Sequence, residues 1–600
     1  MPDSSPILLA SLMGLAVWFI LARERGLVLP TRSPVELFRL SWLVMDRPCL
    51  RHLVLWIATA VLWSRLTTVV ASPPVIDHLL PSGAQAGQSI EVTAVGKFEW
   101  PLQAWSSFDG VRVSPQEENA KLKVTVDSDT PPGIYWIRLY NDEGASVLRP
   151  FVVGSLREAQ EEEPNNRPSN AQSVAQPATV NGRLAANGDV DLYSVDLTAG
   201  DTLVASVEAN RHLNSPMDGI LQLLSKEGFV LAQNDDEHER DPQIVHQVPK
   251  DGTYLLRLFA FPAKPNQRIQ FSGGNDYVYR MTLTTSGFVD HVYPLVVPRR
   301  QPQPVSIRGW SIPEKAATML PLTTLAGERL LVRFDTFGNT FPLRVVGHQV
   351  TLEKEPNGRE AAQAIDVPSS LCGRLDPAGD VDTYKFTAKK GANLRFSIEA
   401  RSLGSPIDPA LRIIDSKGNE VAQSDDADGQ RDPKVDFEAP EDGEYTLEVR
   451  DVFVHGGWRY VYSVHITKPQ PRYQLAVGAD RFELTPGKDL LEIPVSVIRQ
   501  NGFSREIDVA LVGLPASISV TPARSSPRGD TAGSVKLKLS ASQGPFSGVI
   551  RIVGQEVGSR TELKTATFGT GGMNAPSDAI WLTVAAPEKH ETEPPAKAKD

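Results

Sequence analysis

Acidic side chains recur in one pattern at two places in this 600-residue chain. Each copy begins with a Glu-x-Glu-Pro-Asn stretch and continues, about 25 residues later, with an Asp-x-Asp pair. Side chains of an extended chain alternate between its two sides, so the acids and the asparagine of each stretch point the same way. The residues that could converge in this manner are Glu161, Glu163, Asn165, Asp189 and Asp191 in the first copy, and Glu353, Glu355, Asn357, Asp380 and Asp382 in the second.

Such a set of side chains favours a bound cation. Carboxylates brought together repel one another unless positive charge lies among them, and a shell made only of oxygen atoms suits Ca²⁺. The alternative is that these acids are solvated residues of a linker and a turn. The pattern is retained in both copies, with Asn and Pro in place, and this favours calcium.

The sequence match between the two copies continues beyond the acidic residues. Gly182-Arg183-Leu184 matches Gly373-Arg374-Leu375, and Asp251-Gly252-Thr253-Tyr254 matches Asp442-Gly443-Glu444-Tyr445. A self-match over about 115 residues indicates a duplicated domain.

The order of these motifs resembles the bacterial pre-peptidase C-terminal (PPC) domain, a family that includes the collagen-binding domains of secreted clostridial collagenases. The resemblance covers about 240 of the 600 residues. It implies a small jelly-roll-like β-sandwich, often with calcium at the Glu, Asn and Asp positions named above. It does not imply catalysis, since these domains are appendages of secreted hydrolases.

Composition predicts an all-β chain of tandem β-sandwich modules. Six hundred residues correspond to about four domains, and 47 Pro and 45 Gly among many short Val, Ile, Leu and Thr runs argue against long helices. A formal charge of −11 disfavours nucleic acid as a partner. The two cysteines, Cys49 and Cys372, do not indicate a disulfide framework.

Two apolar runs precede the β-rich region, Ile7–Ala22 and Leu53–Trp63. The second has the length of a signal-peptide core, follows basic residues and is followed by Val69-Val70-Ala71. We expect residues 1–71 to be a signal or membrane segment, with Met45 as an alternative start and a two-span hairpin as the rival interpretation. Both versions export residue 72 onward to the periplasm, the cell surface or the medium, and confine membrane contact to the N-terminal segment.

The remaining chain divides into modules by its strand and turn patterns. Val75-Ile76-Asp77-His78 and Gly96 align with Phe288-Val289-Asp290-His291 and Gly309, so the duplicated unit is a pair of modules. The expected divisions are 72–154 for an immunoglobulin-like module that resembles the IPT/TIG kind, 155–287 for the first PPC-like sandwich, 288–350 for a short immunoglobulin-like module, 351–468 for the second PPC-like sandwich, 472–586 for a C-terminal immunoglobulin-like sandwich, and 587–600 for a disordered tail.

Each PPC-like copy ends in an aromatic strand that could bind a ligand. Tyr277 and Tyr279, and likewise Tyr460 and Tyr462, share one face of their strand. An exposed face would be a flat aromatic platform for protein fibres or glycans. In the alternative, the tyrosines cap the core and the intervening valines face outward.

No catalytic motif is found in the sequence. It contains no Gly-x-Ser-x-Gly elbow, no His-Glu-x-x-His helix, no phosphate-binding glycine loop and no Cys–His signature. The sequence therefore predicts an exported, non-catalytic binding or scaffold protein for extracellular protein or polysaccharide. The alternatives are an accessory or substrate-targeting component of a secreted peptidase, and a protease with an unrecognised active site.

Export is directly testable. N-terminal sequencing of the mature protein should give Ser72 or a residue close to it, because signal peptidase cleaves after small residues such as Ala71. An intact cytoplasmic chain that begins at Met1 would contradict this expectation.

Overall fold

The computed structural model describes residues 72–264, 270–299, 304–319, 329–332, 337–426, 431–487, 490–559, 563–570 and 577–586. The expectations for residues 1–71 and for the tail 587–600 lie outside these ranges. Within them, no helix combines the length and the apolar character that a membrane crossing requires.

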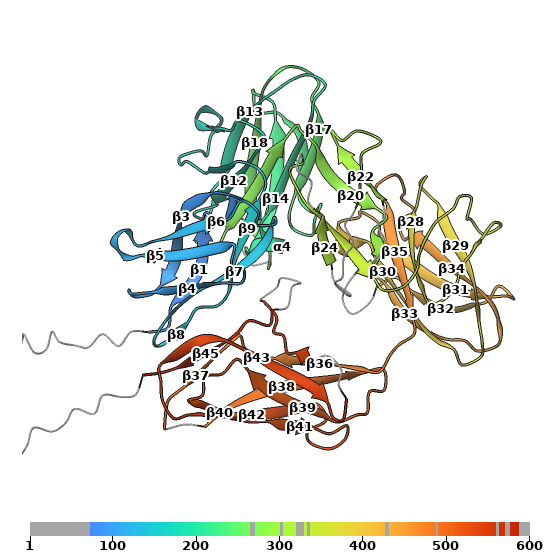
Figure 1. Ribbon diagram of the computed structural model, residues 1–600. Coiled ribbons are helices and arrows are strands. Elements are labelled where there is room, and N and C mark those ends of the chain that lie inside the picture. The colour runs from blue at the N-terminus through green and yellow to red at the C-terminus, as the bar shows by residue number, and fades with distance from the viewer. Residues whose placement is uncertain are drawn as a thin grey trace, which may run out of the picture. The chain divides into compact units, whose positions relative to one another are not determined.

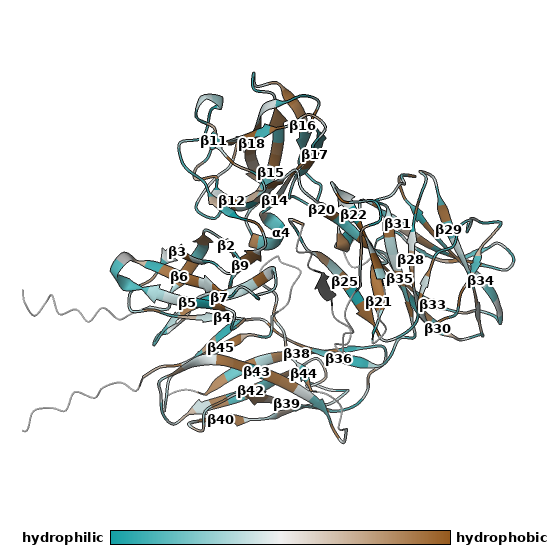
Figure 2. Ribbon diagram, turned by 45° about the horizontal axis from the view of Figure 1, so that its top comes forward, coloured by the Kyte–Doolittle hydropathy of each residue, from teal (hydrophilic) through white to brown (hydrophobic). Residues whose placement is uncertain are grey.

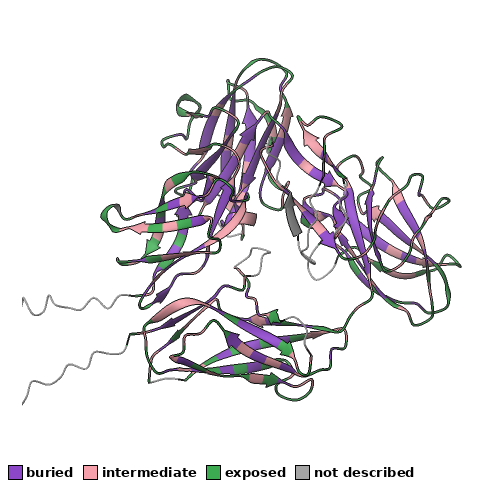
Figure 3. Cartoon of the chain, viewed as in Figure 1, coloured by how far each residue is buried: buried purple, intermediate pink, exposed green. Residues whose placement is uncertain are grey.

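The described residues form almost entirely β-strands, as the composition predicts (Figure 1). The sequence favours strands because apolar and polar residues alternate in it. Every second residue is therefore buried along strands such as β33 (Lys434–Glu438) and β38 (Leu491–Gln500). Figure 2 shows hydrophobic residues concentrated on the strands, and Figure 3 shows buried residues there and exposed residues on the connecting loops. We number the successive β-sandwiches as modules 1 to 5, spanning 75–154, 158–284, 288–346, 350–467 and 472–584.

Modules 2 and 4 contain the two copies of the acidic motif and have the same topology. In module 2 one sheet has the order β10 (Glu158–Gln160), β12 (Ala178–Arg183), β19 (Val278–Thr284), β14 (Thr202–Glu208) and β17 (Gln243–Gln247). The other has the order β11 (Gln172–Ser173), β13 (Asp191–Leu197), β18 (Gly252–Pro262), β15 (Met217–Leu224) and β16 (Val230–Asn234). One short helix, α4 (Asn210–Leu213), follows β14.

Module 4 repeats both sheets strand for strand. Its first sheet has the order β26 (Val350–Leu352), β28 (Ser369–Arg374), β35 (Val461–Thr467), β30 (Asn393–Glu399) and β33. Its second has the order β27 (Gln363–Ala364), β29 (Val381–Ala388), β34 (Gly443–Asp451), β31 (Pro409–Asp415) and β32 (Glu420–Ser424). In both modules the first strand of each sheet pairs in parallel with its neighbour, and the other pairs are antiparallel.

Modules 1 and 3 also share a plan. In module 1 the first sheet has the order β1 (Val75–Leu80), β3 (Ser89–Lys97), β6 (Lys121–Val126) and β5 (Val111–Gln116). The second sheet has the order β2 (Gly83–Gln85), β9 (Arg149–Gly154), β7 (Gly133–Asn141) and β4 (Gln103–Ser106), with β8 (Gly144–Ala145) beside β7. In module 3 the first sheet has the order β20 (Phe288–Tyr293), β22 (Pro304–Trp310) and β23 (Ala317–Met319). The second sheet has the order β21 (Val296–Pro298), β25 (Phe341–Val346) and β24 (Arg329–Val332).

A shared β-bulge explains why one glycine is kept in modules 1 and 3. The register shifts before His78 in one module and before His291 in the other. A Cβ atom on Gly96 would lie 2.0 Å from a backbone carbonyl oxygen of the opposite strand, and the same holds for Gly309. The close approach of the two backbones therefore requires glycine at both positions.

Module 5 is a larger sandwich. One sheet has the order β36 (Arg472–Val477), β38, β42 (Ser534–Ala541) and β40 (Ile518–Thr521). The other has the order β37 (Arg481–Leu484), β45 (Ile580–Val584), β43 (Phe546–Glu556), β39 (Ile507–Val512) and β41 (Ala523–Ser525), with β44 (Lys564–Thr565) beside β43.

Modules 1 and 2 share buried apolar contacts, and so do modules 3 and 4. Val152 of module 1 packs with Leu213 and Val278 of module 2. In the second pair, Leu403 and Val461 of module 4 belong to the core cluster of module 3. The valines between the tyrosines point away from the core of their own module, as the alternative expects, but they are buried against a neighbouring module instead of being exposed.

The junction between modules 1 and 2 can be tested by one truncation. Val278→Ala removes two buried methyl groups and leaves a cavity, so it should lower the free energy of unfolding of this pair by about 2 kcal/mol. Chemical denaturation of the exported chain measures the loss. Val230→Ala, at a half-exposed valine of the same module, is the control and should change it little. Equal effects of the two substitutions would show that Val278 is not a junction residue.

Candidate metal centre

The two acidic stretches of each copy lie side by side in the structure. In module 2 the chain leaves β10, and the Glu161 N–H donates to the carbonyl oxygen of Asn181 (2.9 Å). The Leu192 N–H, at the start of β13, donates to the carbonyl oxygen of Asn165 (3.0 Å). Backbone hydrogen bonds thus hold the Glu-x-Glu-Pro-Asn stretch against both neighbouring strands.

Three carboxylates of each copy converge. Oxygen atoms of Glu161, Glu163 and Asp191 lie within 4.8 Å of one another, and so do those of Glu353, Glu355 and Asp382. Asn165 and Asn357 are fully buried beside them. The Asn165 N–H donates to Glu163 Oε2 (2.8 Å), and its Nδ2 donates to Glu161 Oε1 (3.4 Å).

The first aspartate of each Asp-x-Asp pair lies outside this group of three. Asp189 accepts from the backbone N–H groups of Ala185 (2.6 Å) and Val190 (3.0 Å). Asp380 accepts from those of Asp376 (3.0 Å) and Val381 (2.8 Å). These carboxylates close the turn that precedes β13 or β29, and this use explains why they are retained in both copies.

The same oxygen atoms are left without a partner in both copies. Within the described ranges, Asp191 Oδ1 and Asn165 Oδ1 are buried and accept no hydrogen bond, and neither do Asp382 Oδ1 and Asn357 Oδ1. An unsatisfied buried polar group costs about 1–3 kcal/mol, and more when it is charged. Oxygens that share one calcium ion at 2.3–2.6 Å lie at most about 5 Å apart. The donor set therefore fits a Ca²⁺ ion.

The other oxygen of the buried aspartate is held by a tyrosine. Tyr279 Oη donates to Asp191 Oδ2 (2.5 Å) and lies 2.5 Å from Tyr193 Oη. In module 4, Tyr462 Oη donates to Asp382 Oδ2 and lies 2.7 Å from Tyr384 Oη. In each copy two motif tyrosines form this chain of hydroxyls. One is the second tyrosine of the Tyr-x-Tyr strand, and the other is the tyrosine of the Asp-x-Asp-x-Tyr motif.

The glycine of the Gly-Arg-Leu motif makes this contact possible. A Cβ atom on Gly182 would lie 2.3 Å from Tyr279 Oη, and one on Gly373 would lie 2.3 Å from Tyr462 Oη. Any larger residue would push the tyrosine away from its aspartate.

The tyrosines do not form the exposed aromatic platform considered from the sequence. Tyr279 and Tyr462 are fully buried in their cores, and Tyr277 and Tyr460 are half-buried against the same cores. The alternation of the strand directs them inward, where the second tyrosine of each pair meets a buried carboxylate.

Burial shifts the acids of this site towards their protonated forms. It raises the pKa of Asp382 to about 8 and that of Glu353 to about 7, and the neighbouring carboxylates add to both shifts. Burial likewise raises the pKa of Asp191 well above its usual range and raises that of Glu161. With a pKa of about 8, Asp382 is mostly protonated at neutral pH when no cation is bound.

Comparison with known proteins identifies the modules that carry the site. The family model of the bacterial pre-peptidase C-terminal domain matches residues 189–260 and 380–451. The chain therefore contains two PPC domains, one in module 2 and one in module 4. The matched ranges begin at the Asp-x-Asp pairs, so the Glu-x-Glu-Pro-Asn stretches precede them.

Similar proteins share these domains over part of their length. A "Probable subtilase-type serine protease" of Deinococcus radiodurans is 42% identical over 70 residues, which is 12% of this chain and 10% of that protein. The chain thus spans about a tenth of this relative. Among solved structures, the PPC domain of a Bacillus anthracis collagenase is 21% identical, with 18% of this chain and 93% of that chain covered and a TM-score of 0.15. PliG, a periplasmic lysozyme inhibitor of Aeromonas hydrophila, is 12% identical, with 21% and 98% covered and a TM-score of 0.14.

The structure also reveals a polar network that sequence reasoning missed. Ser370 Oγ lies 2.7 Å from His348 Nε2 and 2.9 Å from His465 Nδ1, and His465 Nε2 lies 3.4 Å from Glu399 Oε2. The residue types match a nucleophile, a base and a carboxylate, but Ser370 is fully buried. A substrate carbonyl cannot reach this hydroxyl. No sequence signal links these residues, because they are spread over more than a hundred positions.

The raised pKa of Asp382 makes a pH-dependent prediction for the metal-free protein. Unfolded aspartate has a pKa of about 3.9, so between about pH 4 and pH 8 the folded state holds more protons than the unfolded state. Stability should therefore fall as the pH rises through this window. Asp382→Asn has no proton to lose and keeps an acceptor for Tyr462. In EDTA it should raise the melting temperature of module 4 by several degrees at pH 8.5 and change it little at pH 5.

Asp436→Asn is the matched control for this experiment. Asp436 lies in the same module but is paired with the guanidinium of Arg395 (2.6 Å), and this bond lowers its pKa. Its substitution should give no gain at pH 8.5. A gain in both variants, or in neither, would contradict the assignment of a buried, protonated Asp382.

Proposed function

We propose that this chain is an exported, non-catalytic binding or scaffold protein whose two PPC domains are each stabilised by a calcium ion. One observation carries the metal assignment. In both copies an aspartate oxygen and an asparagine oxygen are buried beside two glutamates and have no partner among the residues that the structure describes. A cation supplies the interaction that these aspartate and asparagine oxygens otherwise lack.

The chemistry of the site favours calcium over other biological cations. All its donors are oxygen atoms, which disfavours Zn²⁺ and copper, since these ions prefer nitrogen and sulfur. Ca²⁺ accepts 6–8 oxygens in flexible geometry, so four side chains would leave positions for backbone carbonyls and water. Glu163 and Glu355 are exposed, and they offer a route by which the ion enters from solvent.

The position of the site suggests what the ion does. The Glu-x-Glu-Pro-Asn stretch follows the first strand of each PPC domain, close to the junction with the preceding module. An ion that joins this stretch to Asp191 or Asp382 would fasten the start of the sandwich to its core. The ion would therefore act on stability and on the linkage between modules rather than on a reaction.

Two observations support a non-catalytic role and export. The sequence has no catalytic motif, and the Ser370 hydroxyl, which has histidine neighbours, is buried. The PPC domain is named for its place in bacterial peptidases, and a subtilase-type protease shares it with this chain. This association favours an extracytoplasmic location.

A second candidate function is that of an accessory or substrate-targeting component of a secreted peptidase. The similarity to the Deinococcus radiodurans protease favours it. Affinity purification of the exported chain from culture medium should then recover a peptidase in stoichiometric amount. Hydrolysis of protein substrates by the purified chain alone would instead indicate a protease.

Calcium binding is the test of the main proposal. Extracellular sites bind Ca²⁺ with dissociation constants of about 10⁻⁴–10⁻³ M, and a tenfold excess over such a constant stabilises the folded state by about 1.4 kcal/mol. Differential scanning calorimetry should therefore show melting temperatures higher by on the order of 5 °C in calcium than in EDTA. Asp191→Ala should abolish the shift of module 2 only, and Asp382→Ala that of module 4 only.

Two exposed acids provide matched controls. Asp235→Ala and Asp425→Ala remove the same charge from the same modules at exposed positions, and both variants should keep the calcium shift. If the unsubstituted protein binds no calcium at millimolar concentrations, the acids are not ligands and the metal assignment fails.

A further inference from the structure

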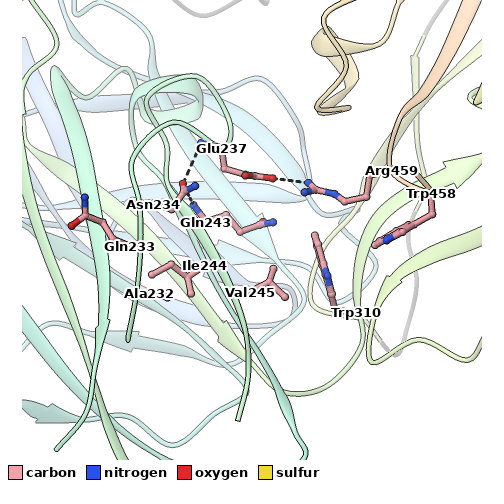
Figure 4. Close-up of a pocket in the computed structure, with 10 residues that line it drawn as sticks. All are labelled: Ala232, Gln233, Asn234, Glu237, Gln243, Ile244, Val245, Trp310, Trp458 and Arg459. Atoms are coloured by element: carbon pink, nitrogen blue, oxygen red, sulfur yellow. Dashed lines mark hydrogen bonds and ion pairs between the residues drawn. The ribbon is translucent and has the colours of Figure 1, made fainter. Parts of the chain in front are cut away.

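A hollow of about 380 Å³ opens between module 2 and the pair formed by modules 3 and 4. Strands β16 and β17 of module 2 form one side of it, and two tryptophans form the other (Figure 4). The residues that matter for its chemistry are Asn234, Gln243, Trp310, Trp458 and Arg459. Its volume falls within the range of about 300–1,000 Å³ that small-molecule sites occupy.

The tryptophan side of the hollow offers aromatic surface. The Trp310 and Trp458 rings lie 6.0 Å apart at 75° to one another. Trp458 is 40% exposed, so part of its ring is open to solvent. The Arg459 guanidinium lies 5.2 Å from the centre of the Trp310 ring and so covers part of that ring. Trp458 is therefore the more accessible of the two.

The opposite side of the hollow carries amide groups. Gln243 is only 5% exposed, and within the described part of the chain its Oε1 atom has no hydrogen-bond partner. Asn234 Oδ1 accepts from the backbone N–H groups of Gln243 (3.0 Å) and Glu237 (3.2 Å), and these bonds fix the asparagine beside the glutamine. Amides both donate and accept hydrogen bonds, as a neutral polyhydroxy ligand requires.

The positive charge of Arg459 at the hollow is already neutralised. Arg459 Nη2 lies 2.6 Å from Glu237 Oε1, and Arg459 Nε lies 2.7 Å from Asp290 Oδ1. A guanidinium that is already paired with two carboxylates has little attraction left for an anionic ligand. The lining thus favours an uncharged ligand.

The internal repeat shows that the fold does not need these aromatic residues. Alignment of the two pairs of modules places Lys97 opposite Trp310, and Asn275-Asp276 opposite Trp458-Arg459. Modules 1 and 2 keep the same strands with these other residues. The tryptophans are therefore a feature of the second pair alone.

We propose that this hollow binds a neutral polysaccharide, with a sugar ring against Trp458 and its hydroxyl groups on the amides of Asn234 and Gln243. The C–H groups on the face of a pyranose carry partial positive charge, and the face of an indole ring is negative. Contact between them excludes water from both surfaces. This assignment rests on the proposed binding function and names its ligand class, but it is independent of calcium.

The same residues also join the modules, so the variants must separate the two roles. Arg459 of module 4 pairs with Glu237 of module 2 and Asp290 of module 3 and lies over the Trp310 ring, and so it holds the modules together. In the described part of the chain, Trp458 has no hydrogen bond or ion pair, and its ring lies near those of Trp310 (6.0 Å) and His291 (5.7 Å). Trp458→Ala therefore removes the sugar-binding face and keeps the ion pairs of the joint.

The experiment is isothermal titration of the full exported chain with four neutral hexasaccharides, from the cello-, xylo-, malto- and chito- (N-acetylated) series. We expect at least one of them to bind and to change the tryptophan fluorescence, and oligogalacturonate, which is anionic, not to bind. Trp458→Ala should weaken the binding at least tenfold. Phe229→Ala, which removes an aromatic ring that is 72% exposed in module 2, should leave it unchanged.

The results separate this assignment from the proposed function. Binding should persist in EDTA and in the Asp191→Ala/Asp382→Ala double variant, so the loss of calcium binding would not remove it. If a hexasaccharide binds equally well to the Trp458→Ala variant, the binding function stands but the hollow is not its site. If none of the four binds, or if gelatin binds in a Trp458-dependent manner instead, the assignment of a neutral polysaccharide is overturned.

Discussion

A buried carboxylate with one satisfied oxygen and one unsatisfied oxygen is the constraint on which each PPC domain depends. Asp191 and Asp382 are fully buried, and each receives a tyrosine hydroxyl on Oδ2 and nothing from the described residues on Oδ1. Burial of such a charge is costly unless a proton or a cation compensates it. Two other features of the domain serve this carboxylate. The glycine of the Gly-Arg-Leu motif leaves room for the tyrosine hydroxyl, and the strand pairing places the glutamates beside the aspartate.

The strand that carries this tyrosine also joins the modules. Along β19, Tyr279 turns towards Asp191 in the core, and Val278 turns towards Val152 and Leu213 at the junction with module 1. Strand β35 repeats this arrangement with Tyr462 and Val461. Because alternate side chains leave a strand on opposite faces, a displacement of the tyrosine at the acidic site would also move the valine at the junction. The acidic site and the module junction are thus mechanically connected within one strand.

Much of this arrangement could be predicted from the sequence, because it depends on local rules. The period of two placed Glu161 and Glu163 on one side of the chain, and the repeat located both copies. What could not be predicted depends on distant partners. The role of Tyr279 requires Asp191, which is 88 positions away, and the burial of Val278 requires another module. A carboxylate that closes a turn, such as Asp189, cannot be distinguished from a metal ligand in a sequence.

The differences between the two copies are as informative as the similarities. Where Thr179 and Thr282 form a hydroxyl pair at 3.2 Å, the second copy has Ser370 and His465 at 2.9 Å, so the sheet keeps its cross-strand hydrogen bond with other residues. Such a change conserves a structural interaction. The replacement of Asn275 by Trp458 conserves none, because it exposes an apolar ring beside a hollow. A ring that stays partly exposed gains less from folding than a buried one, so this change agrees better with the proposed contact to a ligand than with a structural role.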